Sequence, residues 1–161
     1  MNCEEVLSRL IESYKNYYDV STSGCTPPFC AQAEFHSTNN QYIFVKAAKI
    51  SASQSNEFVF FSIQKHLTKE TLCTLEETAW AEGLKKFTVK AGHRNSDITL
   101  IIIAESADDD AVTWLKKIRH YKSYWLTFRG WTNFSAALFL TQKNTFFSNK
   151  FGKPLKKLFP K

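Results

Sequence analysis

The amino-acid sequence predicts a single α+β domain, with three helices and a mixed, mostly antiparallel sheet in the order α-βββ-α-β-α-βββ. The chain has 161 residues, of which 43% are apolar, and this is enough for one hydrophobic core. Segments with apolar residues every three or four positions alternate with short segments rich in β-branched and aromatic residues. One of these, residues 98–104, is apolar on both sets of alternating positions, which is typical of a central strand covered on both faces.

Helix signals occur in three places. The first helix is expected from Cys3 to Tyr18, with its acids near the start and Lys15 near the end, as the helix dipole favours. A second is expected to begin near Thr68 and a third at Ser106, whose hydroxyl suits an N-cap. The expected strands are 29–36, 42–50, 57–64, 98–104, 124–129, 134–140 and 145–148, followed by a basic tail at about 150–161 that is expected to be partly loose.

The cysteines and the chain start predict a cytoplasmic protein that contains no structural metal. The N-terminal residues lack the basic and apolar regions of a signal peptide, and no apolar run is long enough to span a bilayer. The thiols of Cys3, Cys25, Cys30 and Cys73 are therefore expected to be reduced. Only Cys25 and Cys30 are closely spaced, and a zinc site needs a second pair. We therefore expect no metal and no cofactor.

No catalytic residue is assigned, because the motifs of nucleophile elbows, Walker loops and dinucleotide-binding loops are absent from the sequence. The acids of 108–110 are explained by their place at a helix start. The element order resembles the core of the restriction-endonuclease-like nucleases, which carry an acid on the second core strand and E-x-K on the third. Here the second strand offers Lys46 and Lys49, and the third offers Gln64 beside Lys65. The resemblance therefore implies, as one alternative, a degenerate site.

A ligand site is expected where polar residues cluster around the central strand. If the crossovers are parallel, the loop before residue 98 and the loop before residue 124 meet at one end of the sheet. Several cations in these loops would favour an anionic ligand. The candidate ligand-binding residues are His93, Arg94, Lys122, Arg129 and Trp131.

The uneven charge supports a second reading, in which the chain binds nucleic acid. Residues 1–80 hold 6 Lys/Arg against 9 Asp/Glu, whereas residues 81–161 hold 15 against 6, so the halves carry −3 and +9. In the tail, lysines that could meet phosphates alternate with phenylalanines that could stack on bases. The competing interpretation is an amphipathic tail with docked phenylalanines and solvated lysines. The residues concerned are Lys150, Lys153, Lys156 and Lys157, with Phe147, Phe151 and Phe159.

Residues 93–152 resemble a family of small bacterial proteins classified as a domain of unknown function. The similar positions are His93 with Ser96, residues 97–103, Lys122-Ser123-Tyr124, Gly130-Trp131, and Asn149 with Gly152. The resemblance implies a bacterial cytoplasmic protein and transfers no activity, cofactor or catalytic residue. The sequence therefore predicts a non-catalytic binding or regulatory domain. Its aromatic content also leaves a homodimer open.

Overall fold

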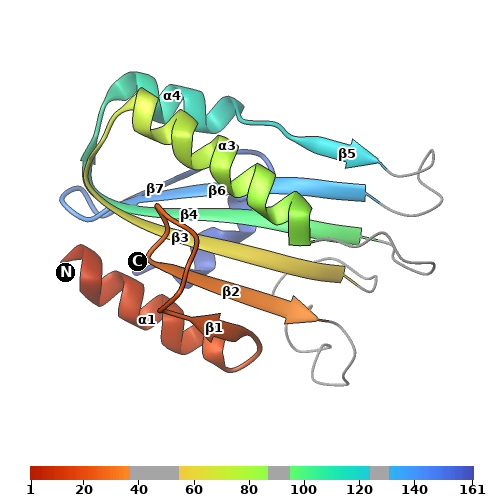
Figure 1. Ribbon diagram of the computed structural model, residues 1–161. Helices are drawn as coiled ribbons and strands as arrows, with labels where there is room; N and C mark the ends of the chain where they lie inside the picture. Colours follow the sequence, from red (N-terminus) through yellow and green to blue (C-terminus); the bar gives the residue numbers. More distant parts are fainter. Residues whose placement is uncertain (37–54, 87–94, 124–130) are drawn as a thin grey trace.

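Eleven helices and strands make up the part of the chain that the structure describes, which is residues 1–36, 55–86, 95–123 and 131–161 of a computed structural model (Figure 1). In chain order they are α1 (Cys3–Lys15), β1 (Asp19–Ser21), β2 (Ala31–His36), β3 (Ser55–Leu67), α3 (Lys69–Lys86), β4 (Asn95–Ala107), α4 (Asp109–Lys117), β5 (Tyr121–Ser123), β6 (Trp131–Leu140), β7 (Thr145–Ser148) and the 3₁₀ helix η1 (Lys153–Leu158).

The described strands form one seven-stranded mixed sheet, in the order β1-β2-β3-β4-β6-β5, with β7 also paired to β6. The three central strands, β3, β4 and β6, run parallel to one another, and they form the two longest ladders. The pairings of β1, β2, β5 and β7 are antiparallel. The parallel centre follows from the helical crossovers, because a helix between two strands returns the chain to the same end of the sheet.

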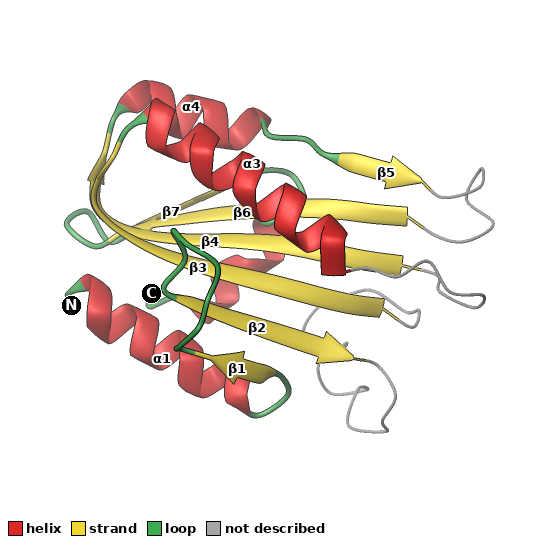
Figure 2. Ribbon diagram, in the orientation of Figure 1, coloured by secondary structure: helices red, strands yellow, loops and turns green. Residues whose placement is uncertain are grey.

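Helices cover both faces of the sheet (Figure 2). On one face, the apolar sides of α3 and α4 pack on the even-numbered positions of the central strands, such as Ile98, Leu100 and Ile102. On the other face, α1 and the C-terminal segment cover odd-numbered positions such as Ile101 and Ile103. This alternation buries β4 on both faces, as the apolar run of residues 98–104 predicts.

Several sequence expectations are confirmed and others are corrected. The single mixed domain and the three expected α-helices are present, but the centre of the sheet is parallel, and η1 is a fourth helix within the described residues. The first helix ends at Lys15 instead of Tyr18, and the chain then forms the unpredicted strand β1. α4 begins after its N-cap Asp108, not at Ser106, because β4 continues to Ala107. The expected strands 42–50 and 124–129 lie outside the described residues.

The C-terminal tail is packed, contrary to the expectation that it is partly loose. Leu155 and Phe159 are buried on the α1 side of the sheet. The ring of Phe159 stacks on Phe139 with 5.1 Å between centroids, and it also contacts Phe146. The apolar positions of the tail therefore hold it against the domain, because their burial offsets the entropy of ordering the chain.

Asn149 fills a gap along the outer edge of β6. β5 pairs with residues 131–133 of β6 and β7 with residues 137–140, so neither strand pairs with the stretch between them. There the Asn149 side chain accepts a hydrogen bond from the Ala136 N–H (3.0 Å) and donates one to the Phe134 carbonyl (2.9 Å). It also donates to the Ile118 carbonyl at the end of α4 and accepts from the Gly152 N–H. One buried amide thus replaces a missing piece of strand.

Gly152 is required by the same arrangement. A Cβ atom at this position would overlap the carbonyl oxygen of Ala136, which belongs to the backbone and cannot move aside as a side chain could. The spacing of Asn149 and Gly152, two of the positions that carry the family resemblance, therefore has a structural explanation.

Two buried tyrosines predict that the fold is sensitive to alkaline pH. Burial raises the pKa of Tyr14 and of Tyr18 above the usual value, and for Tyr18 the neighbouring Tyr14 and Asp97 add to the effect. The unfolded chain loses these protons near pH 10, whereas the folded chain keeps them. The free energy of unfolding should therefore be unaffected by these groups below about pH 10 and fall as the pH rises above it.

Tyr14→Phe tests this explanation. In the described part of the chain the Tyr14 hydroxyl is buried without a hydrogen-bond partner, so its removal should stabilise the fold by about 1 kcal/mol. It should also reduce the loss of stability above about pH 10. Urea unfolding on both sides of that pH measures the two effects. An unchanged slope of stability against pH in the variant would show that another group is responsible.

Candidate functional site

The α1 side of the sheet changes from apolar to polar along the central strands. Where α1 and the C-terminal segment cover it, the strands present residues such as Phe61, Ile101 and Phe139. Nearer the strand starts the same face carries polar side chains. Register places Glu57, Asp97 and Asn133 in one row across the sheet, with Thr99 and Ser135 in the next row. We call these five residues the polar floor: Glu57, Asp97, Thr99, Asn133 and Ser135.

Glu57 anchors one side of the polar floor. It is only 5% exposed, and a buried carboxylate is stable only if it accepts hydrogen bonds. The Tyr18 hydroxyl donates to its Oε2 at 2.6 Å, and the Thr99 hydroxyl donates to its Oε1 at 3.0 Å. Tyr18 comes from the short segment between α1 and β1, so this network joins the N-terminal elements to the central strands.

The remaining part of the polar floor is accessible. Asp97, Asn133 and Ser135 are half-buried, and they lie beside one another on β4 and β6. Asp97 is close enough to Tyr18 for its charge to contribute to the raised pKa of that tyrosine. The floor therefore offers a carboxylate, an amide and a hydroxyl, which together can accept and donate hydrogen bonds to one small ligand.

Two exposed aromatic side chains border the polar floor at the outer edge of the sheet. Tyr121 on β5 lies opposite Asn133, and Trp131 lies two residues before Asn133 on β6, so both belong to the face of the floor. Tyr121 is 58% exposed and Trp131 is 36% exposed. Exposed aromatic side chains thus lie next to polar side chains on one face of the sheet, a combination of residue types that ligand sites use.

The structure places two of the five residues predicted to bind a ligand. Trp131 borders the polar floor, whereas Lys122 pairs with Thr132 and so belongs to the α3 and α4 side of the sheet. His93, Arg94 and Arg129 lie outside the described residues. Sequence reasoning missed Glu57, Asp97 and Asn133. A sequence signal for them was available. In each strand, counting in steps of two from the apolar residues of the α1 face leads to a polar residue near the strand start.

A chain of hydrogen bonds connects Ser106, His66 and Asp108 where β3 and β4 end, at the other end of the sheet from the polar floor. His66 Nδ1 lies 2.7 Å from Ser106 Oγ, and His66 Nε2 lies 2.8 Å from Asp108 Oδ1. Hydrolases use the same three residue types. Here the His66 and Asp108 side chains are about half exposed on open surface, and Asp108 stands at the N-cap of α4 without capping it. These hydrogen bonds are explained by a structural role, because they hold the turn between β4 and α4 against the end of β3.

A buried carboxylate also joins α3 to the segment after α4. Glu76 accepts a hydrogen bond from Trp114 Nε1 (2.8 Å) and lies 2.7 Å from His120 Nε2. Trp80 stacks on the His120 ring with 5.0 Å between centroids. All four groups are engaged with one another, so this cluster is a packing element between helices and offers no open position for a ligand.

The lysines of the alternative nucleic-acid surface are exposed. Lys153, Lys156 and Lys157 lie on η1, and Lys150 precedes it. The phenylalanines between them differ: Phe151 is 42% exposed, whereas Phe159 is buried and Phe147 is half-buried. Most of the aromatic surface that could stack on bases is therefore already used in packing.

The chain is a mixed α/β domain whose sheet carries the polar floor near the starts of its parallel strands. The chain belongs to the family described as Domain of unknown function (DUF8052), whose model matches residues 2–161. The resemblance to a domain of unknown function is thus confirmed. No curated protein and no solved structure matches the chain. None of the helices in the described ranges has the length and apolar character that a membrane crossing requires.

Proposed function

We propose that this protein is a non-catalytic binding domain and that its ligand is a small hydroxylated molecule held on the polar floor. The observation that carries the proposal is the register: it brings Asp97, Asn133 and Ser135 together on one accessible face beside Trp131. Hydroxyl groups of a ligand can donate to the carboxylate and exchange hydrogen bonds with the amide. An apolar face of the same ligand can rest on the exposed indole ring.

The hydrogen bonds of the buried acid in the polar floor support a binding role. Glu57, the most buried acid of the floor, is held by two hydroxyl groups instead of facing a substrate. In the described ranges, no group of three His, Cys, Asp or Glu side chains could hold a metal ion.

The sequence also predicts an anionic ligand, and this prediction narrows the proposal to hydroxylated molecules that carry a negative charge. In the sequence, Arg94 directly precedes β4 and Arg129 lies two residues before β6, and these two strands carry most of the polar floor. A hydroxylated ligand that also carries a phosphate or carboxylate would use both kinds of group. The four free cysteines support a cytoplasmic location, and the family resemblance supports a bacterial source.

A ligand panel tests the proposal. Neutral monosaccharides, sugar phosphates and aliphatic amines are screened by saturation-transfer NMR, and the dissociation constants of the compounds that bind are measured by titration. At least one hydroxylated compound should bind, and Trp131→Ala should weaken it roughly tenfold or more, because the variant loses the stacking surface. Asp97→Asn should weaken the same compound, because it loses a charged acceptor.

Trp114→Ala is the matched control, since Trp114 is exposed to a similar degree but lies on α4, on the other side of the sheet. It should leave the affinity unchanged. Binding of amines alone, or equal loss of affinity in both tryptophan variants, would refute the proposed site. Tighter binding of the phosphates than of the neutral sugars would support the anionic refinement.

A further inference from the structure

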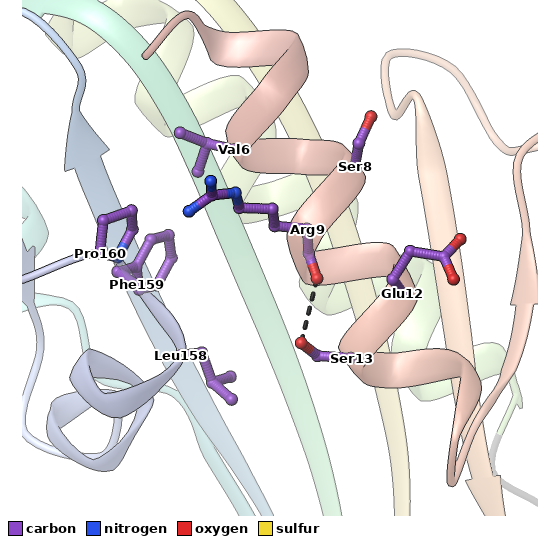
Figure 3. Close-up of a pocket in the computed structure, with 8 residues that line it drawn as sticks. All are labelled: Val6, Ser8, Arg9, Glu12, Ser13, Leu158, Phe159 and Pro160. Carbon is purple, nitrogen blue, oxygen red and sulfur yellow. Dashed lines mark hydrogen bonds between the residues drawn. The ribbon is translucent and has the colours of Figure 1, made fainter.

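An open groove separates α1 from the end of the C-terminal segment (Figure 3). Its volume is about 540 Å³. Two of its lining residues, Val6 and Phe159, belong to the core on the α1 side of the sheet, and none belongs to the polar floor. The residues that line it are Val6, Ser8, Arg9, Glu12 and Ser13 from α1, and Leu158, Phe159 and Pro160 from the C-terminal segment.

One cation points into this groove. Figure 3 shows the Arg9 guanidinium extending from α1 toward Phe159 and Pro160. Within the described residues no carboxylate forms an ion pair with Arg9, whereas Glu12 on the same wall is engaged by Lys15 at 2.7 Å. The guanidinium is thus available, and it presents several donors in a fork that matches a carboxylate.

The C-terminal wall adds positive charge and an exposed apolar side chain. Lys156 and Lys157 are exposed and directly precede Leu158, and no acidic residue occurs from 143 to 161. Leu158 is 37% exposed, whereas Val6 and Phe159, which also line the groove, are buried. The groove therefore combines the Arg9 guanidinium and the apolar side chain of Leu158, with two exposed lysines next to Leu158 in the chain.

We propose that this groove binds an acidic peptide segment of a partner protein, with a carboxylate on Arg9 and a neighbouring apolar side chain on Leu158. The charge complementarity selects an anionic partner. A peptide is favoured over a nucleic acid because Phe159, the aromatic side chain in the lining, is stacked on Phe139 and only 6% exposed, so little of its ring is left to stack on a base. This inference is independent of the proposed ligand of the polar floor, since the two surfaces have no residue in common.

The test measures fluorescence anisotropy of a labelled peptide composed of glutamate and leucine, with the full-length protein. The peptide should bind, and Arg9→Gln should weaken it roughly tenfold or more, because one charge-assisted bidentate contact is lost. Leu158→Ser should also weaken it. Arg119→Gln is the matched control, since Arg119 is an exposed arginine that follows α4 on the other side of the sheet.

Two further probes separate the alternatives. A lysine–leucine peptide should not bind, and a glutamate–serine peptide should bind more weakly than the glutamate–leucine peptide. The proposal is overturned if the glutamate–leucine peptide does not bind, or if Arg9→Gln and Arg119→Gln change its affinity equally. It is also overturned if a labelled single-stranded oligonucleotide displaces the glutamate–leucine peptide and binds more tightly. Circular dichroism of each variant shows that the fold is retained, because all three substituted side chains are exposed.

Discussion

Replacing Asn149 with alanine should lower the free energy of unfolding by about 3–5 kcal/mol. The substitution removes four hydrogen bonds and leaves two backbone N–H groups and two carbonyls without these partners. The side chain is 1% exposed, so water does not replace the lost bonds without local opening. Urea unfolding followed by circular dichroism measures the change.

Asn16→Ala is the control for this variant. Asn16 is exposed at the end of α1, and its amide makes only long contacts of 3.4 and 3.5 Å to carbonyls. Its substitution should change the free energy of unfolding by less than about 0.5 kcal/mol. If the Asn149 variant lost no more stability than the Asn16 variant, the view that this amide replaces a piece of strand would be wrong.

Glu57→Ala should have the second largest effect, a loss of about 2–4 kcal/mol. The variant leaves the hydroxyls of Tyr18 and Thr99 without their acceptor in a buried place. Glu57→Gln should cost less, because its amide keeps the shape and one acceptor oxygen. Thermal and urea unfolding of both variants provide the comparison.

An exposed acid calibrates the Glu57 result. Glu12 forms a surface ion pair with Lys15, and such pairs contribute little to stability, so Glu12→Gln should change it by less than about 1 kcal/mol. If Glu57→Ala were as mild as Glu12→Gln, the link between Tyr18 and the sheet would not depend on this carboxylate. A similar loss in Glu57→Ala and Glu57→Gln would point to the charge itself as the stabilising feature.

The helices and the central strand were predictable because their signals are local. The apolar run of residues 98–104 and the three-to-four spacing in α1 state directly which faces are buried. Strand β1 has only three residues and depends on pairing with β2, which no local pattern reveals. The packing of the tail was anticipated only as one of two interpretations, an amphipathic tail with docked phenylalanines. The sequence could not decide between them, because Leu155 and Phe159 are isolated apolar positions whose contacts come from distant elements.

The candidate site was predictable only in part. Trp131 was included among the candidate ligand-binding residues because it lies in the polar stretch 129–133, and the structure places it at the border of the polar floor. Asp97 and Asn133 lie 36 positions apart in sequence, and only the parallel register between β4 and β6 makes them neighbours. Register is set by the packing of the whole sheet, so sequence patterns within single strands could not place these residues together.

The hydrogen bonds along the outer edge of β6 also limit the ways in which a partner protein can bind. Many proteins associate by extending a sheet with a strand from a partner, which requires a row of unused backbone groups. Along β6 that row is occupied by β5, the Asn149 amide and β7 in turn, and the opposite edge begins with a strand of three residues. In the described part of the chain, the strands left at the edges of the sheet, β1, β5 and β7, have only three or four residues each and offer little backbone to a partner strand. We therefore expect recognition mainly through side chains on the faces of the domain, and crosslinks to a partner should map to those faces.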